Sequence, residues 1–185
     1  MRTAAMTAGE GYAVIGPARA ESADQAVERL YRQYRLQLVR LAYLQVGDRE
    51  SAEDIAQDAF AGLHRHYQRL RSPEAALGYL RTATMNGARS ALRRRRTSRR
   101  FPQPDESALS VESAEATSLL SAEHAEVLAA IRRLPERQRE VLLLRYWSEL
   151  GEAEIARTLG ISIGAVKSNA SRGRATLASM LGQDR

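Results

Sequence analysis

The apolar residues of this chain recur at helical spacing, and no stretch alternates between apolar and polar residues as a half-buried β-strand does. Between residues 23 and 46 they include Val27, Leu30, Tyr34, Leu38 and Leu41. Intervals of three or four positions place such residues on one face of an α-helix. Further stretches with this spacing follow at 51–63, 73–92, 119–133 and 135–146. The pattern predicts an all-α protein.

The start of the second helix is indicated by its polar residues. Gly47 and Asp48 interrupt the first apolar stripe. Ser51 stands just before the next stripe, and Glu53 and Asp54 would then lie in the first turn of the new helix. Serine is a favoured N-cap residue, and carboxylates are favourable near a helix N-terminus. We therefore expect Ser51 to cap this helix.

A polar segment divides the predicted helices into two groups. Residues 97–118 contain two prolines, several serines and several acidic residues without amphipathic order, which indicates a linker. Aromatic residues make up only 5% of the chain, so two modest cores are expected instead of one large core. We predict a disordered N-terminal extension (1–22), two small helical domains (23–96 and 119–182) and a flexible linker between them (97–118).

Composition argues against several classes of function. The chain has no cysteine, which excludes disulfides, thiolate metal sites and cysteine nucleophiles. No apolar run approaches the ~18 residues of a membrane span, and the apolar patch at 12–15 is too short for a secretory signal. We expect a cytoplasmic protein that does not insert into membranes.

Metal-dependent catalysis is a weak alternative. His64 and His66 stand two positions apart, so on a helix they point to different faces and form a poor chelate. The acidic cluster Glu53, Asp54 and Asp58 is the other candidate metal site, and a solvated surface explains it more simply. We predict a protein that is not an enzyme and has no cofactor, no metal and no catalytic residues.

Arginine is concentrated in the stretch "ALRRRRTSRR" at 91–100, within a chain of net charge +6. A run of like charge is more often solvated or disordered than functional. Its interpretation therefore depends on whether the chain has a second element that faces nucleic acid.

That second element is the stretch "EAEIARTLGISIGAVKSNASRGRATL", which has the pattern of a helix-turn-helix. Ala156 is small enough for two helices to cross, Gly160 can adopt the positive φ of the turn, and Val166 can anchor the second helix. Ser162 is placed to cap that helix. A second helix of this kind enters the major groove of DNA. The candidate DNA-binding residues here are Ser162, Gly164, Lys167, Ser168, Asn169, Arg172 and Arg174.

Three stretches together resemble the sigma-70 superfamily of bacterial RNA polymerase sigma factors, specifically its short extracytoplasmic-function (ECF) type. "AEDIAQDAF" (52–60) is similar to region 2.2, "YLRTATMNGARSALRRRR" (79–96) to regions 2.3–2.4, and "LPERQREVLLLRY" (134–146) to region 4. The resemblance covers Leu30–Arg96 as region 2 and Leu120–Leu181 as region 4. It implies a protein that binds core RNA polymerase and directs promoter-specific initiation.

The resemblance also implies roles for particular residues. Asp54, Gln57 and Asp58 would dock on the β′ coiled coil of the polymerase, and region 4 would meet the β flap. Asn86 would hold a base flipped from the melted −10 strand, in a pocket completed by the loop at 67–72. Region 4 would read the −35 element. The arginines implied to hold phosphates in region 2 are Arg81, Arg89, Arg93, Arg94, Arg95 and Arg96.

Several positions depart from the pattern of the family. Ser90 stands where an aspartate is frequent, and Asn169, Ala170 and Gly173 stand where Arg, Leu and Ala are common in region 4. A glycine in a helix interior costs ~1 kcal/mol relative to alanine, so region 4 is expected to be somewhat less stable than in relatives. The specificity for a −35 sequence cannot be carried over from them.

The linker length permits both an extended and a compact chain. Residues 97–118 reach at most ~75 Å when fully extended but average ~25–28 Å when relaxed. The two domains of the free protein can therefore pack against each other. We hypothesise that an anti-sigma partner holds such a compact, inactive form.

Two other functions are compatible with the sequence. A stand-alone helix-turn-helix regulator would share the turn "GISIGAVKS" but would leave residues 30–96 unexplained. An arginine-rich RNA binder would use the run at 91–100. Titration with core polymerase separates them from a sigma factor, because only a sigma factor gains promoter-specific initiation.

Overall fold

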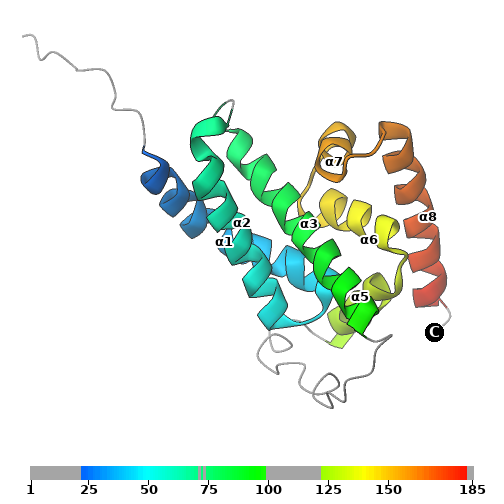
Figure 1. Ribbon diagram of the computed structural model, residues 1–185. Coiled ribbons are helices and arrows are strands. Elements are labelled where there is room, and N and C mark those ends of the chain that lie inside the picture. Colours follow the sequence, from blue (N-terminus) through cyan, green and yellow to red (C-terminus); the bar gives the residue numbers. More distant parts are fainter. Residues whose placement is uncertain (1–21, 71, 73, 99–121, 183–185) are drawn as a thin grey trace, which may run out of the picture.

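The computed structural model describes residues 22–70, 72, 74–98 and 122–182. Within these ranges the regular structure is entirely helical (Figure 1), which confirms the predicted fold class. None of the helices found there combines the length and apolar character that crossing a bilayer requires. The predicted N-terminal extension, apart from Ser22, and the linker from residue 99 onward lie outside the described residues.

The N-terminal half is a three-helix unit. It consists of α1 (Ala23–Val46), α2 (Arg49–His66), the 3₁₀ turn η1 (Tyr67–Arg69) and α3 (Ala75–Ser98). The predicted apolar face of α2 is buried, including Ala59, Phe60 and Leu63. These side chains pack with Leu38 of α1 and Leu80 of α3. The apolar residues that the helical spacing placed on one face of each helix are therefore buried together, as expected.

The junction of α1 and α2 differs from the prediction at one residue. Gly47 ends α1 in the left-handed region, with φ 84° and its N–H donating to Tyr43 O. Asp48, not Ser51, caps α2, because its carboxylate accepts a hydrogen bond of 2.8 Å from the backbone N–H of Ser51. The prediction that Ser51 is the N-cap is wrong. The helix begins earlier because a carboxylate directly after the Gly47 turn already satisfies the free N–H groups.

The residues that the structure describes in the C-terminal half form five helical elements. They are α5 (Ala122–Arg133), α6 (Glu136–Leu142), the π-helical turn η3 (Leu143–Trp147), α7 (Glu152–Leu159) and α8 (Ile163–Gly182). Pro135 directly precedes α6, as its fixed φ favours. Gly151 is the N-cap of α7, where Glu154 Oε2 accepts from the Gly151 N–H at 3.1 Å.

The two halves pack against each other. Figure 1 shows α3 running between α2 on one side and the C-terminal helices on the other. One apolar cluster includes Leu41, Leu44 and Met85 from the N-terminal half together with residues such as Leu144 and Ile155 from the C-terminal half. The expectation that the free protein can fold its two units together is confirmed.

Candidate nucleic-acid interface

Helices α7 and α8 form the predicted helix-turn-helix. Gly160 adopts φ 65° and ψ 39°, and the N–H of Ile161 donates to Ala156 O at 3.1 Å. Ser162 Oγ accepts from the N–H of Ala165 at 3.1 Å and so caps α8. Val166 is 1% exposed and anchors α8 in the core. The predicted turn at Gly160, cap at Ser162 and anchor at Val166 are confirmed.

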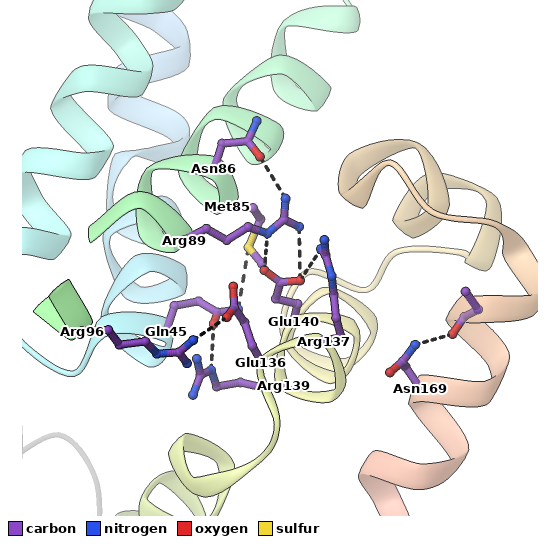
Figure 2. A network of polar contacts seen from close by, with 11 residues as sticks. Gln45, Met85, Asn86, Arg89, Arg96, Glu136, Arg137, Arg139, Glu140 and Asn169 are labelled. Carbon is purple, nitrogen blue, oxygen red and sulfur yellow. Dashed lines mark hydrogen bonds and ion pairs between the residues drawn. The ribbon is translucent and has the colours of Figure 1, made fainter. Parts of the chain in front are cut away.

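The predicted DNA-binding residues of this motif lie on its outer surface, with one exception. Asn169 is half-buried, and its amide donates to the carbonyl of Ala165 one turn earlier at 2.8 Å (Figure 2). Lys167 Nζ lies 3.7 Å from Glu152 Oε2 of α7, and Arg174 donates to Tyr146 Oη at 3.4 Å. The exposed members of the set are Ser162, Gly164, Lys167, Ser168, Arg172 and Arg174.

Gly173 has a structural role that its helix propensity does not suggest. It is buried where α8 crosses α6. A Cβ atom at this position would lie 3.0 Å from Leu142 Cδ1 and 3.2 Å from Gln138 Cβ. The glycine therefore allows a close approach of the two helices, which offsets the propensity cost predicted from the sequence.

Helix α3 presents the second set of candidate DNA-binding residues. The Asn86 side chain is exposed, and its Oδ1 accepts a hydrogen bond of 3.1 Å from Arg89. Arg93 and Arg94 are exposed near the end of the helix. Arg81 is partly buried, and this burial lowers the pKa of its guanidinium, while the negative charge of Glu154 acts in the opposite direction.

Arg89 connects α3 to α6. Its guanidinium makes a bidentate contact with the Glu140 carboxylate, with Nη2 3.2 Å from Oε2 and Nε on Oε1. The Glu140 side chain is 1% exposed and also accepts from Arg137 at 2.9 Å. Figure 2 shows Asn86, Arg89, Glu140 and Arg137 as one continuous network, with Asn169 apart from it on α8.

Two further arginines of the arginine-rich stretch at 91–100 also have polar partners within the chain. Arg95 donates to Val46 O at 2.8 Å and to Ser51 Oγ at 3.0 Å, and it pairs with Asp48. It thus ties the end of α3 to the junction of α1 and α2. Arg96 Nη1 lies 3.5 Å from Glu136 Oε2 of α6. Their predicted contacts to DNA stay predictions.

The sequence did not predict one buried polar group beneath this network, the side chain of Arg139. Arg139 of α6 is 6% exposed and donates to Gln45 Oε1 of α1 at 2.9 Å and to Arg132 O at 2.8 Å. Burial lowers the pKa of Arg139, while Glu136 and Glu140 oppose that shift. Its partner Gln45 stands 94 positions away in the sequence, so no local pattern indicates this pair.

The surface predicted to contact polymerase lies on α2. Asp54, Gln57 and Asp58 are all exposed, whereas Ile55 and Phe60 are buried on the opposite face. Asp54, Gln57 and Asp58 thus lie on the side of α2 that faces away from the core, as predicted. Their role as a docking surface stays a prediction.

His64 and His66 each have a partner within the N-terminal half. His64 Nε2 lies 2.6 Å from Asp24 Oδ1, and His66 Nδ1 lies 2.8 Å from Gly62 O. Within the ranges that the structure describes, no three histidine or carboxylate side chains are grouped so that they could hold a metal ion.

Two family models match this chain. The model for sigma-70 region 2 matches residues 30–98, and the model for sigma-70 region 4 matches residues 124–177. The matched ranges include both α3 and the helix-turn-helix.

Two curated relatives match this chain over more than three quarters of their own length. The ECF RNA polymerase sigma factor SigM of Mycobacterium tuberculosis is 32% identical over 157 residues, covering 85% of this chain and 78% of SigM. The RNA polymerase sigma-E factor of Streptomyces coelicolor is 30% identical over 140 residues, covering 76% of this chain and 77% of the relative.

Two solved structures share the fold. The sigma factor RpoE of Bartonella quintana, in complex with the anti-sigma factor NepR, matches with a TM-score of 0.66 and 21% identity, over 85% of this chain and 98% of RpoE. CnrH, in complex with the cytosolic domain of CnrY, matches with a TM-score of 0.65 and 23% identity, over 88% of this chain and 96% of CnrH.

Proposed function

Since the chain belongs to the ECF type of the sigma-70 family of RNA polymerase sigma factors, we propose that it reads promoter DNA through the particular residues described above. As a sigma factor it binds core RNA polymerase and directs promoter-specific initiation. Region 2 recognises and melts the −10 element, and region 4 reads the −35 element. The polymerase, and not this chain, performs the chemistry.

The observation that carries the proposal for region 4 is the exposed face of α8. The Gly160 turn and the Ser162 cap set the start of this helix, and Lys167 and Arg172 point outward from it. Residues near the start of such a helix contact base edges, and cations further along it bind phosphates. We assign Ser162, Gly164, Lys167 and Ser168 to the first group.

For region 2 we assign base recognition to Asn86 and phosphate binding to the arginines of α3. An amide can hydrogen-bond the Watson–Crick edge of a flipped base, and the pocket must offset an unstacking cost of a few kcal/mol. Asn86 is exposed and one turn from Arg89. Arg93 and Arg94 extend the positive charge along the same helix.

For the polymerase we assign the exposed face of α2. Asp54, Gln57 and Asp58 form an exposed acidic and polar surface on a helix other than α3 and α8. We propose that this surface docks on the β′ coiled coil and that region 4 contacts the β flap. We further propose that the protein acts in the cytoplasm and is inhibited there by an anti-sigma factor, since the similar sigma factor RpoE forms a complex with the anti-sigma factor NepR.

The alternative of a stand-alone helix-turn-helix regulator is not favoured, because the region 2 match accounts for residues 30–98. The test of the proposal is run-off transcription with purified bacterial core polymerase and a promoter library. We expect initiation from a defined subset of promoters only when the chain is added. Duplex binding without any association with core polymerase would refute the proposal.

A further inference from the structure

We propose that Glu140 of region 4 competes with nucleic-acid phosphate for Arg89 of region 2, and so closes the free chain against the −10 strand without any partner protein. This inference rests on the proposed function, because it assumes that Arg89 and Asn86 bind DNA. It concerns the regulation of that same site.

The geometry places an anion substitute at the predicted DNA site. Glu140 occupies both arms of the Arg89 guanidinium, and a third nitrogen of Arg89 holds the Asn86 amide at 3.1 Å. Carboxylates and phosphates are both recognised by the guanidinium fork in this bidentate manner. While Glu140 is bound, Arg89 therefore lacks the fork for a phosphate, and the Asn86 carbonyl oxygen is engaged.

Other carboxylates of the C-terminal half face the same arginine set. Glu136 lies 3.5 Å from Arg96, and Glu154 is the acidic group whose charge acts on Arg81. Region 4 thus presents carboxylates to several of the side chains assigned to phosphates. The apolar cluster that includes Leu41, Leu44 and Met85 holds the two halves in this arrangement.

The ion pair between Arg89 and Glu140 can be replaced by an ion pair between Arg89 and a DNA phosphate. A buried ion pair that loses one partner is strongly destabilising, because the remaining charge stays unpaired. Here Arg137 also binds Glu140, at 2.9 Å, so the carboxylate keeps a cation when Arg89 turns to DNA. Arg89 itself is 22% exposed, and its side chain reaches solvent without unfolding α3.

The closed arrangement leaves the predicted polymerase surface accessible. Asp54, Gln57 and Asp58 of α2 are exposed while Glu140 holds Arg89. The free chain can therefore dock on core polymerase while its −10 site is still occupied. Closure thus withholds the −10 site of the free protein from single-stranded DNA, and it is relieved when promoter strand is supplied at the polymerase.

The test compares Glu140→Gln with Glu28→Gln in the full-length chain. Both remove one carboxylate, but Glu28 pairs with Arg32 within α1 and does not join the two halves. Binding of a fluorescein-labelled, mixed-sequence single-stranded DNA is measured by anisotropy. If the closed form makes up about nine tenths of the population, its loss tightens the apparent affinity about tenfold, whereas Glu28→Gln matches the wild type.

Distances within the molecule give an independent readout. The chain has no native cysteine, so labels at Ala61→Cys of α2 and Ser179→Cys of α8, both at exposed positions, report the separation of the halves. We expect this separation to increase when single-stranded DNA is added and to be larger in Glu140→Gln before DNA is added. Circular dichroism verifies that each variant is folded.

Should Glu140→Gln fail to fold, Glu136→Gln tests the parallel competition between a carboxylate of region 4 and phosphate for Arg96. Its effect on DNA affinity is smaller, about twofold, as for a surface ion pair. Unchanged affinity and unchanged label separation in the folded variants would overturn the inference. Failure of the proposed function is recognised separately, because in that case the wild-type chain itself does not bind core polymerase.

Discussion

Two glycines inside helices should respond to alanine in opposite directions. Gly173 in α8 is buried against α6, whereas a Cβ added at Gly78 in α3 would meet nothing within 4 Å. Glycine in a helix interior costs ~1 kcal/mol relative to alanine. By propensity alone, Gly173→Ala and Gly78→Ala would therefore stabilise the protein equally.

The contacts at Gly173 reverse the sign of the effect. The new Cβ would lie 3.0 Å from Leu142 Cδ1 and 3.2 Å from Gln138 Cβ. The Gln138 Cβ is fixed to its backbone, and Leu142 is 4% exposed, so neither neighbour can withdraw freely. Overpacking of this kind costs ~1–3 kcal/mol. After the gain in propensity, Gly173→Ala should destabilise the fold by about 1 kcal/mol, while Gly78→Ala should stabilise it by about 0.5–1 kcal/mol.

Thermal unfolding followed by circular dichroism measures the difference. In a chain of this length, 1 kcal/mol corresponds to ~2–4 °C in Tm, so the two variants should lie on opposite sides of the wild type. A double-mutant cycle with Leu142→Ala should give a coupling of at least ~0.5 kcal/mol with Gly173→Ala. Additive effects, or a Gly173→Ala variant more stable than the wild type, would refute the proposed close approach.

Four further predictions concern the proposed interfaces and the core. Asn86→Ala should impair open-complex formation while core binding survives. The activity of the variant should therefore be restored on a pre-melted template, which run-off transcription measures. Equal activity of the variant on intact and pre-melted templates would contradict the assignment of Asn86 to the base pocket. Arg172→Ala should lower the salt slope of duplex binding by about one unit, and an unchanged slope would place this side chain off the phosphates. Asp58→Lys should weaken core polymerase binding in a pull-down but leave binding of free DNA duplex intact. Arg139→Ala should lower the free energy of unfolding by about 3 kcal/mol, because it leaves the buried Gln45 Oε1 without its donor and opens a gap in the core. Denaturation midpoints within error of the wild type would show that this contact is dispensable.

Local patterns in the sequence were enough to predict the elements and the helix-turn-helix. The apolar spacing of the helices and the turn at Gly160 with its Ser162 cap each depend on neighbours within one or two turns. The same local reasoning was wrong at Ser51, because both Asp48 and Ser51 suit an N-cap and only the geometry after Gly47 selects Asp48. Residues 54, 57 and 58 were placed correctly on the exposed face of α2 for the same periodic reason.

What the tertiary structure alone decided is how the two halves meet. Arg89 and Glu140 are 51 positions apart, and Arg139 and Gln45 are 94 apart, so neither pair leaves a trace in helical spacing. On the sequence, Arg139 and Glu140 have the composition of a solvated helix surface, yet both are buried. Gly173 likewise appears as a weak point of α8 until α6 is seen against it. A residue's helical conformation depends on its chain neighbours, but its burial and its ionic partners depend on which faces pack together, and this is determined only once the whole chain has folded.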